Sequence, residues 1–200
     1  MIRAIIFDFG RVITAQKPSS LFARYERGLG LTPNTINPIM FGSQVWQDAL
    51  LGRKTMKEFW YAIGPKLRLN TPEEIDAFSH RYHNDEAINK RVLKLIYNLH
   101  GKYKLAVLSN SPPGLVKWLV DWKILHLFDF VFCSGDEGVV KPDPIAFKVT
   151  LDQLSVKPEE AVFIDDTIGH VKAAQTLGLK GILFTTAELL SQELKTLIDL

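Results

Sequence analysis

Five short apolar runs constrain the fold of this chain more than any other feature. From residue 85 onward, stretches with apolar residues at helical spacing lie between successive runs. This alternation of strand and helix predicts an α/β fold, in which helices sandwich a Rossmann-like parallel sheet and the crossovers are right-handed. The expected strands are residues 2–7, 105–108, 130–133, 161–164 and 181–184, and the last two helices are expected at residues 167–177 and 187–198.

The segment between the first and second runs lacks a convincing strand and is expected to be all-helical. Two capping boxes mark helix starts within it, at Thr55 with Glu58 and at Thr71 with Glu74. The expected helices are one that starts at Ser19 or Ser20, then residues 35–40, 43–51, 55–63 and 72–82. We therefore expect a core made of residues 1–15 and 86–200, interrupted by a helical insertion of residues 16–85.

Composition limits the class of protein. An apolar content of 46% supports a real hydrophobic core, and a formal charge of +2 without a dense Lys/Arg run argues against a nucleic-acid partner. The single cysteine, Cys133, excludes an internal disulfide and favours a reducing compartment. No apolar run reaches the roughly 18 residues of a membrane span, and the first run is too short for a signal peptide. We expect a cytoplasmic protein without a membrane partner, and its oligomeric state stays open.

Polar residues follow four of the five expected strands. They are Asp8, Ser109 with Asn110, Lys141 a short loop beyond its strand, and Asp165 with Asp166. Each has an ordinary structural explanation when taken alone, as a loop residue, a helix cap or a solvated side chain. Because parallel strands point the same way, however, their carboxyl ends share the edge of the sheet where ligands bind in open α/β folds. One shared site accounts for all of these residues together.

The chemistry that suits this set of residues is phosphoryl transfer. Three clustered carboxylates repel one another and favour a hard divalent cation, for which all-oxygen ligands indicate Mg²⁺. Lys141 would place a positive charge beside a phosphoryl group, and the Ser109 hydroxyl would donate a hydrogen bond to it. Asp8, kept ionised by the cation and the lysine, would then attack phosphorus and form an aspartyl-phosphate.

These motifs resemble, in order and in spacing, those of the haloacid dehalogenase-like hydrolase superfamily. The resemblance is carried by residues 5–10, 107–110, 138–144 and 162–166, with Val171, Ala173 and Ala174 behind the last motif. It implies that Asp8 is the nucleophile and that Ser109, Asn110 and Lys141 hold the transferring group. It further implies a Mg²⁺ site made by Asp8, the backbone carbonyl of Gly10, Asp165 and Asp166. The insertion resembles the small helical cap that selects the substrate in one subgroup of this superfamily.

Gly10 departs from the family pattern. Most phosphatases of the superfamily carry a second aspartate at this position, two residues after the nucleophile, where it serves as general acid and base. The loss of such a group typically lowers the rate by about 10²- to 10⁴-fold. We expect a Mg²⁺-dependent phosphatase of a small phosphorylated metabolite, with sugar phosphates among the candidates. It would either prefer good leaving groups or take its proton from Thr14, the insertion or the substrate.

Two other functions stay open at this point. A 2-haloacid dehalogenase uses the same aspartate to displace halide from carbon, lacks the second aspartate and needs no metal. In that case Asp165 and Asp166 would place two surplus negative charges beside an anionic substrate, which favours the phosphatase. A non-catalytic member of the family that binds a ligand or a partner is also compatible with Gly10.

A few residues outside the motifs are weaker candidates. His170 lies one turn into the helix after Asp166 and could reach the metal, although the sequence favours a surface or packing role. In the insertion, aromatic residues at helical spacing more often form the core than a substrate-binding wall, and arginines are usually solvated. The candidates there are Trp46, Trp60, His80, His83, Arg24 and Arg53.

Overall fold

A sheet of five parallel strands lies at the centre of the protein, within residues 1–198, which the computed structural model describes. The strands are β1 (Ala4–Phe7), β2 (Lys104–Ser109), β3 (Phe130–Cys133), β4 (Ala161–Asp165) and β5 (Lys180–Leu183). Their order is β3-β2-β1-β4-β5, so β1 lies in the middle and pairs with β2 and β4. Phe7, the last residue of β1, is level with Val107 on one side and Ile164 on the other. The residues that follow these three strands therefore meet at one edge of the sheet.

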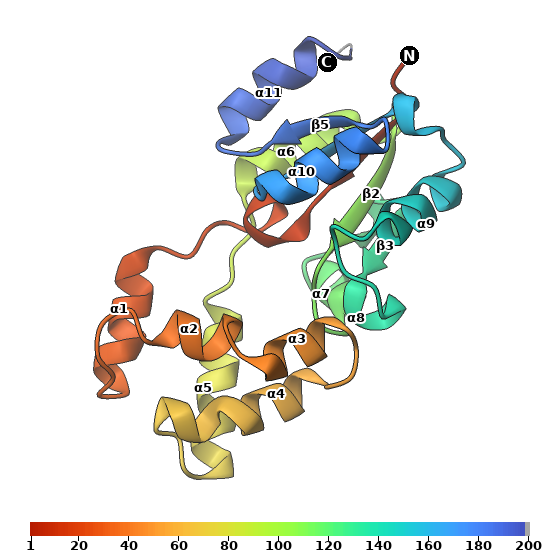
Figure 1. The fold of residues 1–200 in the computed structure, drawn as a ribbon. Coiled ribbons are helices and arrows are strands. Elements are labelled where there is room, and N and C mark those ends of the chain that lie inside the picture. Colours follow the sequence, from red (N-terminus) through yellow and green to blue (C-terminus); the bar gives the residue numbers. More distant parts are fainter. Residues whose placement is uncertain (199–200) are drawn as a thin grey trace.

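Helices cover both faces of the sheet (Figure 1). Alternate side chains of β1 point to opposite faces, so Ile5 and Phe7 join one apolar cluster while Ala4 and Ile6 join another. The first cluster includes α6 (Lys90–Leu99), α7 (Leu115–Asp121) and α11 (Ala187–Lys195), and the second includes α9 (Pro144–Leu154) and α10 (Ile168–Thr176). All four residues of β1 are fully buried, as a central strand covered on both faces requires. The predicted α/β fold class is confirmed.

Between residue 14 and α6, the described chain contains helices and no strand of the sheet. These helices are α1 (Ser19–Gly28), α2 (Ile36–Phe41), α3 (Gln44–Leu50), α4 (Met56–Ile63) and α5 (Pro72–Asn84), with a short 3-10 helix, η2 (Gly64–Leu67). Both expected capping boxes are present, at Thr55 and at Thr71. The helices pack around an apolar cluster of their own, which includes the fully buried Phe59 and Ile63. In Figure 1 they lie below the sheet, on the side of α7.

Two adjacent chain segments connect this helical part to the sheet. The Ala15 amide donates to the Ala87 carbonyl oxygen at 2.7 Å, and the Asn89 amide donates to the Ile13 carbonyl oxygen at 2.8 Å. A salt bridge of 2.5 Å between Lys17 and Glu86 lies just beyond these backbone bonds. Because the outgoing and returning segments pair with each other here, we propose residues 16–85 as the boundaries of the insertion.

The insertion also contacts the core directly. The imidazole of His83, in α5, lies against the indole of Trp118, in α7, with ring centroids 3.7 Å apart. In the loop between α3 and α4, Gly52 approaches Gly135 of α8 (Ser134–Glu137) so closely that a Cβ at Gly52 would lie 2.1 Å from the Gly135 carbonyl oxygen. These two contacts hold the insertion over the carboxyl ends of the strands.

Short elements differ most from the sequence expectation. A π-helical turn, η1 (Phe9–Ile13), follows β1, and single turns form α8, η3 (Leu125–Leu127) and η4 (Pro158–Glu160). One turn contains too few residues to produce a readable hydrophobic period. The last helix ends at Lys195 rather than at residue 198, because the apolar pattern continues past the helix end, where Ile198 still packs in the core. Within the described residues, no helix has the length and apolar character needed to cross a membrane.

Candidate active site

Three carboxylates converge at the carboxyl ends of β1 and β4. Asp8 follows the last residue of β1, Asp165 ends β4 and Asp166 comes next in the chain. The register of these neighbouring strands places one ligand oxygen from each of the three within 4.8 Å of the others. Asp165 is fully buried and Asp8 nearly so, whereas Asp166 is partly exposed. The structure thus brings together the acidic residues that the sequence predicts as metal ligands.

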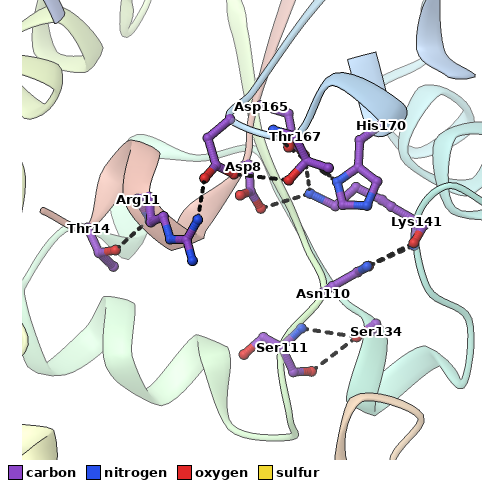
Figure 2. A network of polar contacts seen from close by, with 11 residues as sticks. Asp8, Arg11, Thr14, Asn110, Ser111, Ser134, Lys141, Asp165, Thr167 and His170 are labelled. Atoms are coloured by element: carbon purple, nitrogen blue, oxygen red, sulfur yellow. Dashed lines mark hydrogen bonds and ion pairs between the residues drawn. The ribbon is translucent and has the colours of Figure 1, made fainter. Parts of the chain in front are cut away.

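Lys141 joins two of these carboxylates (Figure 2). Its Nζ donates to Asp8 Oδ1 at 2.8 Å and to Asp165 Oδ2 at 2.6 Å, and the side chain is almost completely buried. The loop that carries Lys141 is fixed by Asn110, whose side-chain Nδ2 donates to the Lys141 carbonyl oxygen at 2.9 Å. In return, the Lys141 amide donates to Asn110 Oδ1 at 2.7 Å. Since both ends of the Asn110 amide are used in this way, its direct contribution is to position Lys141.

Asp165 has further polar partners besides Lys141. The Thr167 amide donates to Asp165 Oδ1 at 2.8 Å, and His170 Nδ1 lies 3.2 Å and 3.1 Å from the two carboxylate oxygens. The preference for a surface or packing role of His170 was wrong, because α10 turns this side chain back toward the end of β4. The residue spacing already allowed this contact, since a residue in the first turn of a helix lies near the strand that precedes it.

The electrostatics of the two buried carboxylates differ. Burial raises the pKa of Asp8 to about 6, repulsion from Asp165 adds to this effect, and the ammonium of Lys141 opposes it. Burial also acts to raise the pKa of Asp165, but the hydrogen bond from His170 and the charge of Lys141 outweigh it and lower that pKa. Two buried carboxylates therefore share one ammonium, which leaves room for additional positive charge beside Asp8.

Arg11 is a site residue that the sequence reasoning missed. Its backbone adopts φ +59° within η1, and its amide donates to Thr14 Oγ1 at 2.8 Å. From there the guanidinium reaches Asp166, with Nη1 3.2 Å from Oδ2. Its position in the sequence could have identified it, because Arg11 comes directly after Gly10 in the loop that follows the expected nucleophile.

Ser109 and Gly10 complete the edge of the site. Ser109 ends β2, is buried and lines the same cleft as Asp8. Gly10 has an ordinary backbone conformation, with φ −65° and ψ 126°. The nearest atom to a Cβ built there is Asp8 Oδ2 at 3.9 Å, so the position has space for a larger side chain.

A cleft of about 1820 Å³ extends from these residues to the insertion. On the core side it is lined by Asp8, Ser109, Asn110, Lys141, Asp166 and His170, and on the insertion side by Trp46, Trp60, His80 and His83, among others. Arg24 and Arg53 are not among the lining residues and instead pair with Asp85 and Asp48. A second hollow of about 1090 Å³ lies near Arg3 and His100, where the described residues bring no such acidic cluster together.

Comparisons with known proteins find a family and several relatives. The family model described as haloacid dehalogenase-like hydrolase matches residues 2–178. A drimenol cyclase of Aspergillus calidoustus is 27% identical over 191 residues, which cover 92% of this chain and 34% of the cyclase. A sesquiterpene phosphatase of Aspergillus oryzae is 25% identical over 98% of this chain and 96% of its own length. A D-ribitol-5-phosphate phosphatase of Bacteroides thetaiotaomicron is 26% identical over 90% of each chain. The chain thus spans a third of the cyclase and nearly all of the two phosphatases.

Solved structures share the fold. A haloacid dehalogenase family enzyme from Bacteroides thetaiotaomicron, in complex with magnesium and inorganic phosphate, superposes with a TM-score of 0.75. Its sequence is 22% identical, and the superposition covers 92% of this chain and 95% of that enzyme. The likeness extends over the sheet and the helical insertion together.

Proposed function

This chain belongs to the haloacid dehalogenase-like hydrolases, as its motifs predict, and we propose that it is a Mg²⁺-dependent phosphatase of a small phosphorylated metabolite. The observation that carries the proposal is the pair of buried carboxylates, Asp8 and Asp165, bridged by Lys141 at the base of a large cleft. Relatives of about the same length that are named phosphatases support it. A cytoplasmic location stays a prediction that rests on the single cysteine.

The donor set at the strand ends fits Mg²⁺, which prefers hard oxygen ligands. We propose Asp8, Asp166 and the Gly10 carbonyl as direct ligands and Asp165 as a ligand through water. Asp165 is fully buried and accepts hydrogen bonds from Lys141 and from the Thr167 amide, whereas Asp166 is partly exposed and its partners are the exposed Arg11 guanidinium and the Thr167 hydroxyl. When bound, the ion would neutralise negative charge on the phosphoryl group and orient it toward Asp8.

Asp8 acts as the nucleophile in this proposal. One of its carboxylate oxygens forms a bond to phosphorus while the bond from phosphorus to the ester oxygen breaks, which gives an aspartyl-phosphate and releases the alcohol oxygen. Water then attacks phosphorus while the bond from phosphorus to the Asp8 oxygen breaks, and the proton of the attacking water passes to solvent, which frees the Asp8 carboxylate and inorganic phosphate. Lys141, 2.8 Å from Asp8, favours the ionised nucleophile and offers positive charge to the phosphoryl oxygens. The Ser109 hydroxyl donates a hydrogen bond to the same group.

Without an acid at Gly10, the departing alcohol oxygen takes its proton from water, from the insertion or from the substrate itself. Thr14 is a poor substitute, because it is buried and its Oγ1 accepts the Arg11 amide, which fixes it as part of the loop. Esters of acidic alcohols need no such proton. We therefore expect aryl phosphates to react about 10² times faster than alkyl phosphates or more.

The charge balance of the site favours the phosphatase over a dehalogenase. A haloacid brings a carboxylate of its own, and without a metal this would face Asp165 and Asp166 as well as the nucleophile. Of the described cations, Lys141 is already shared by two carboxylates and Arg11 pairs with Asp166. When a phosphoryl group binds together with Mg²⁺, the positive charge of the ion offsets the negative charges of the carboxylates and the phosphoryl group.

The test is hydrolysis of p-nitrophenyl phosphate with Mg²⁺, with EDTA, and by the variant Asp8→Asn. We expect turnover that needs Mg²⁺ and that disappears in Asp8→Asn but persists in Asp152→Asn, a matched change at an exposed position of α9. Turnover of a 2-haloacid in EDTA would instead establish the dehalogenase. A folded protein that binds Mg²⁺ and hydrolyses no phosphate ester would be a non-catalytic member of the family.

A further inference from the structure

The insertion presents a continuous row of aromatic rings to the cleft. Phe41 and Trp46 have ring centroids 5.1 Å apart, and Trp46 and Trp60 both contact Phe59, at 5.3 Å each. Trp60 in turn lies 5.4 Å from Tyr82. With Met56, the members of this row that line the cleft form what we call the aromatic wall: Phe41, Trp46, Met56, Trp60 and Tyr82.

The aromatic wall is not simply the core of the insertion. Phe41 keeps 37% of its surface exposed, and Trp46 and Met56 are partly exposed, whereas Phe59 directly behind them is fully buried. Large apolar side chains that stay exposed inside a cleft lose contact with water only when something apolar covers them. The aromatic wall therefore has exposed apolar surface that an apolar ligand can cover.

Three charged side chains that border the cleft in the insertion or directly beside it, Lys17, Glu26 and Glu86, are held by other groups of the protein. Lys17 pairs with Glu86 at 2.5 Å. Glu26 is buried and accepts the backbone amides of Thr35 and Ile36, at 2.8 Å and 3.1 Å, at the start of α2. A sugar needs several free donors and acceptors at fixed positions, and these side chains are already used within the protein.

We propose that the aromatic wall binds the organic part of the substrate and that this part is a bulky apolar group, so the substrate is a phosphate monoester of an apolar alcohol rather than a sugar phosphate. The proposal rests on the phosphatase function proposed above. It adds the substrate class and names Phe41 and Trp46 as residues that select it. In Figure 1, α2 and α3, which carry this part of the wall, lie below the sheet and face the strand ends.

The experiment uses ethyl, butyl, hexyl and octyl phosphate, with ribitol 5-phosphate as the polar counterpart. The leaving groups are all primary alkoxides, so differences in rate report binding of the organic part and not the missing acid. We expect kcat/KM to rise by about two- to fourfold per methylene, as burial of apolar surface predicts, and ribitol 5-phosphate to react no faster than ethyl phosphate. A flat series, or a clear preference for ribitol 5-phosphate, would overturn the proposal.

Matched variants connect the effect to the wall. Phe41→Ala and Trp46→Leu should flatten the chain-length dependence and lower kcat/KM for octyl phosphate by about tenfold or more. Phe41 is exposed enough that its truncation leaves the packing of the insertion largely intact. The control is Tyr97→Ala, an exposed aromatic residue of α6 that does not line the cleft and should leave the whole series unchanged.

A binding measurement separates failure of this proposal from failure of the phosphatase function. Alkylphosphonates of the same chain lengths, which cannot be hydrolysed, are titrated in the presence of Mg²⁺ while tryptophan fluorescence is followed. Affinity that increases with chain length in the wild type and not in Phe41→Ala supports the apolar subsite even if no ester is hydrolysed. Affinity independent of chain length overturns it, even if p-nitrophenyl phosphate is turned over.

Discussion

At the scale of single residues, Gly10 decides how the protein handles its leaving group. Its backbone conformation is ordinary and a Cβ there meets only Asp8 Oδ2, at 3.9 Å, so Gly10→Asp can be accommodated. We expect this variant to raise turnover of ethyl phosphate by about 10²-fold and that of p-nitrophenyl phosphate much less, because only the former needs a proton. Gly10→Asn has the same shape without the acid, and an equal gain in that variant would contradict the explanation.

Asp8 makes stability depend on pH when no metal is bound. Burial raises its pKa from the usual 3.8 to about 6, so the folded protein holds this proton more tightly than the unfolded chain. The contribution of Asp8 to the free energy of unfolding is therefore greatest below about pH 4. It decreases as the pH rises from about 4 to about 6 and stays low at higher pH. Since Asp8→Asn removes the ionisation, it should unfold at a higher temperature than the wild type at about pH 7.5 in EDTA.

The difference should be about 3 kcal/mol in the free energy of unfolding at about pH 7.5 and should shrink toward about pH 4.5. Thermal melts across this range measure it. Added Mg²⁺ should stabilise the wild type and leave Asp8→Asn nearly unchanged. A gap between the two proteins that is the same at every pH would show that burial of the Asp8 charge is not its cause.

Arg11 is expected to compete with Mg²⁺ for Asp166. Its guanidinium is largely exposed and lies 3.2 Å from Asp166 Oδ2, and an exposed pair of this kind contributes up to about 1 kcal/mol. Arg11→Gln should therefore bind Mg²⁺ up to about fivefold more tightly, measured by isothermal titration. Arg53→Gln removes an equally exposed arginine that pairs with Asp48 in the insertion. If both variants changed Mg²⁺ affinity alike, net charge rather than the pair would be responsible.

The sequence predicted the residues whose position follows from strand ends alone. Asp8, Ser109, Asp165 and Asp166 directly end or follow strands, and parallel strands bring such residues together whatever their separation. Arg11 and His170 could not be placed in this way. The conformation of η1 and the start of α10 direct their side chains, and neither depends on a hydrophobic pattern.

At the scale of elements, the loop between α3 and α4 fixes how closely the insertion approaches the core. Gly52 has φ +71°, and a Cβ there would lie 2.1 Å from the Gly135 carbonyl oxygen. Gly52→Ala should push this loop away from α8, widen the cleft and raise KM by about three- to tenfold in addition to lowering stability. Steady-state kinetics and a thermal melt measure the two effects.

Gly101 provides the matched control for that substitution. It has a similar backbone conformation, φ +78°, but nothing lies within 4 Å of a Cβ built on it. Gly101→Ala should cost roughly 1 kcal/mol of stability through backbone strain and leave KM unchanged. A similar change of KM in both variants would mean that the contact with Gly135 does not govern the cleft.

Elements with a long or distinctive pattern could be predicted from the sequence. A strand buried on both faces produces an apolar run, and Thr55 with Glu58 produces a capping box. Each of these patterns lies within a few consecutive residues, so the sequence alone identifies the element. α8 could not be predicted, because four residues show no period and its position depends on distant bonds. There the Ser134 hydroxyl accepts the Ser111 amide at 3.0 Å, and the Gly135 amide donates to the Ser111 carbonyl oxygen at 2.9 Å.

At the scale of the whole molecule, the sequence predicts a sheet covered by helices on both faces. It predicts neither the order of the strands in that sheet nor the shape of the cleft. The strand order β3-β2-β1-β4-β5 depends on where each crossover returns, and nothing local in the chain specifies it. The cleft depends in turn on how two separately packed bodies meet. The position of the insertion relative to the sheet is set by a few contacts, such as that of His83 with Trp118. No sequence pattern marks the residues that make these contacts.

The paired segments that lead into and out of the insertion have an evolutionary consequence. The Ala15 amide and the Ala87 carbonyl oxygen are 2.7 Å apart, so the insertion begins and ends at nearly the same point in space. Material inserted at such a point can be lengthened, replaced or exchanged without moving the strands that hold Asp8 and Asp165, because the apolar clusters on the two sides of the junction are separate. A lineage with this architecture can acquire new substrates by recombination while its reaction chemistry is inherited unchanged.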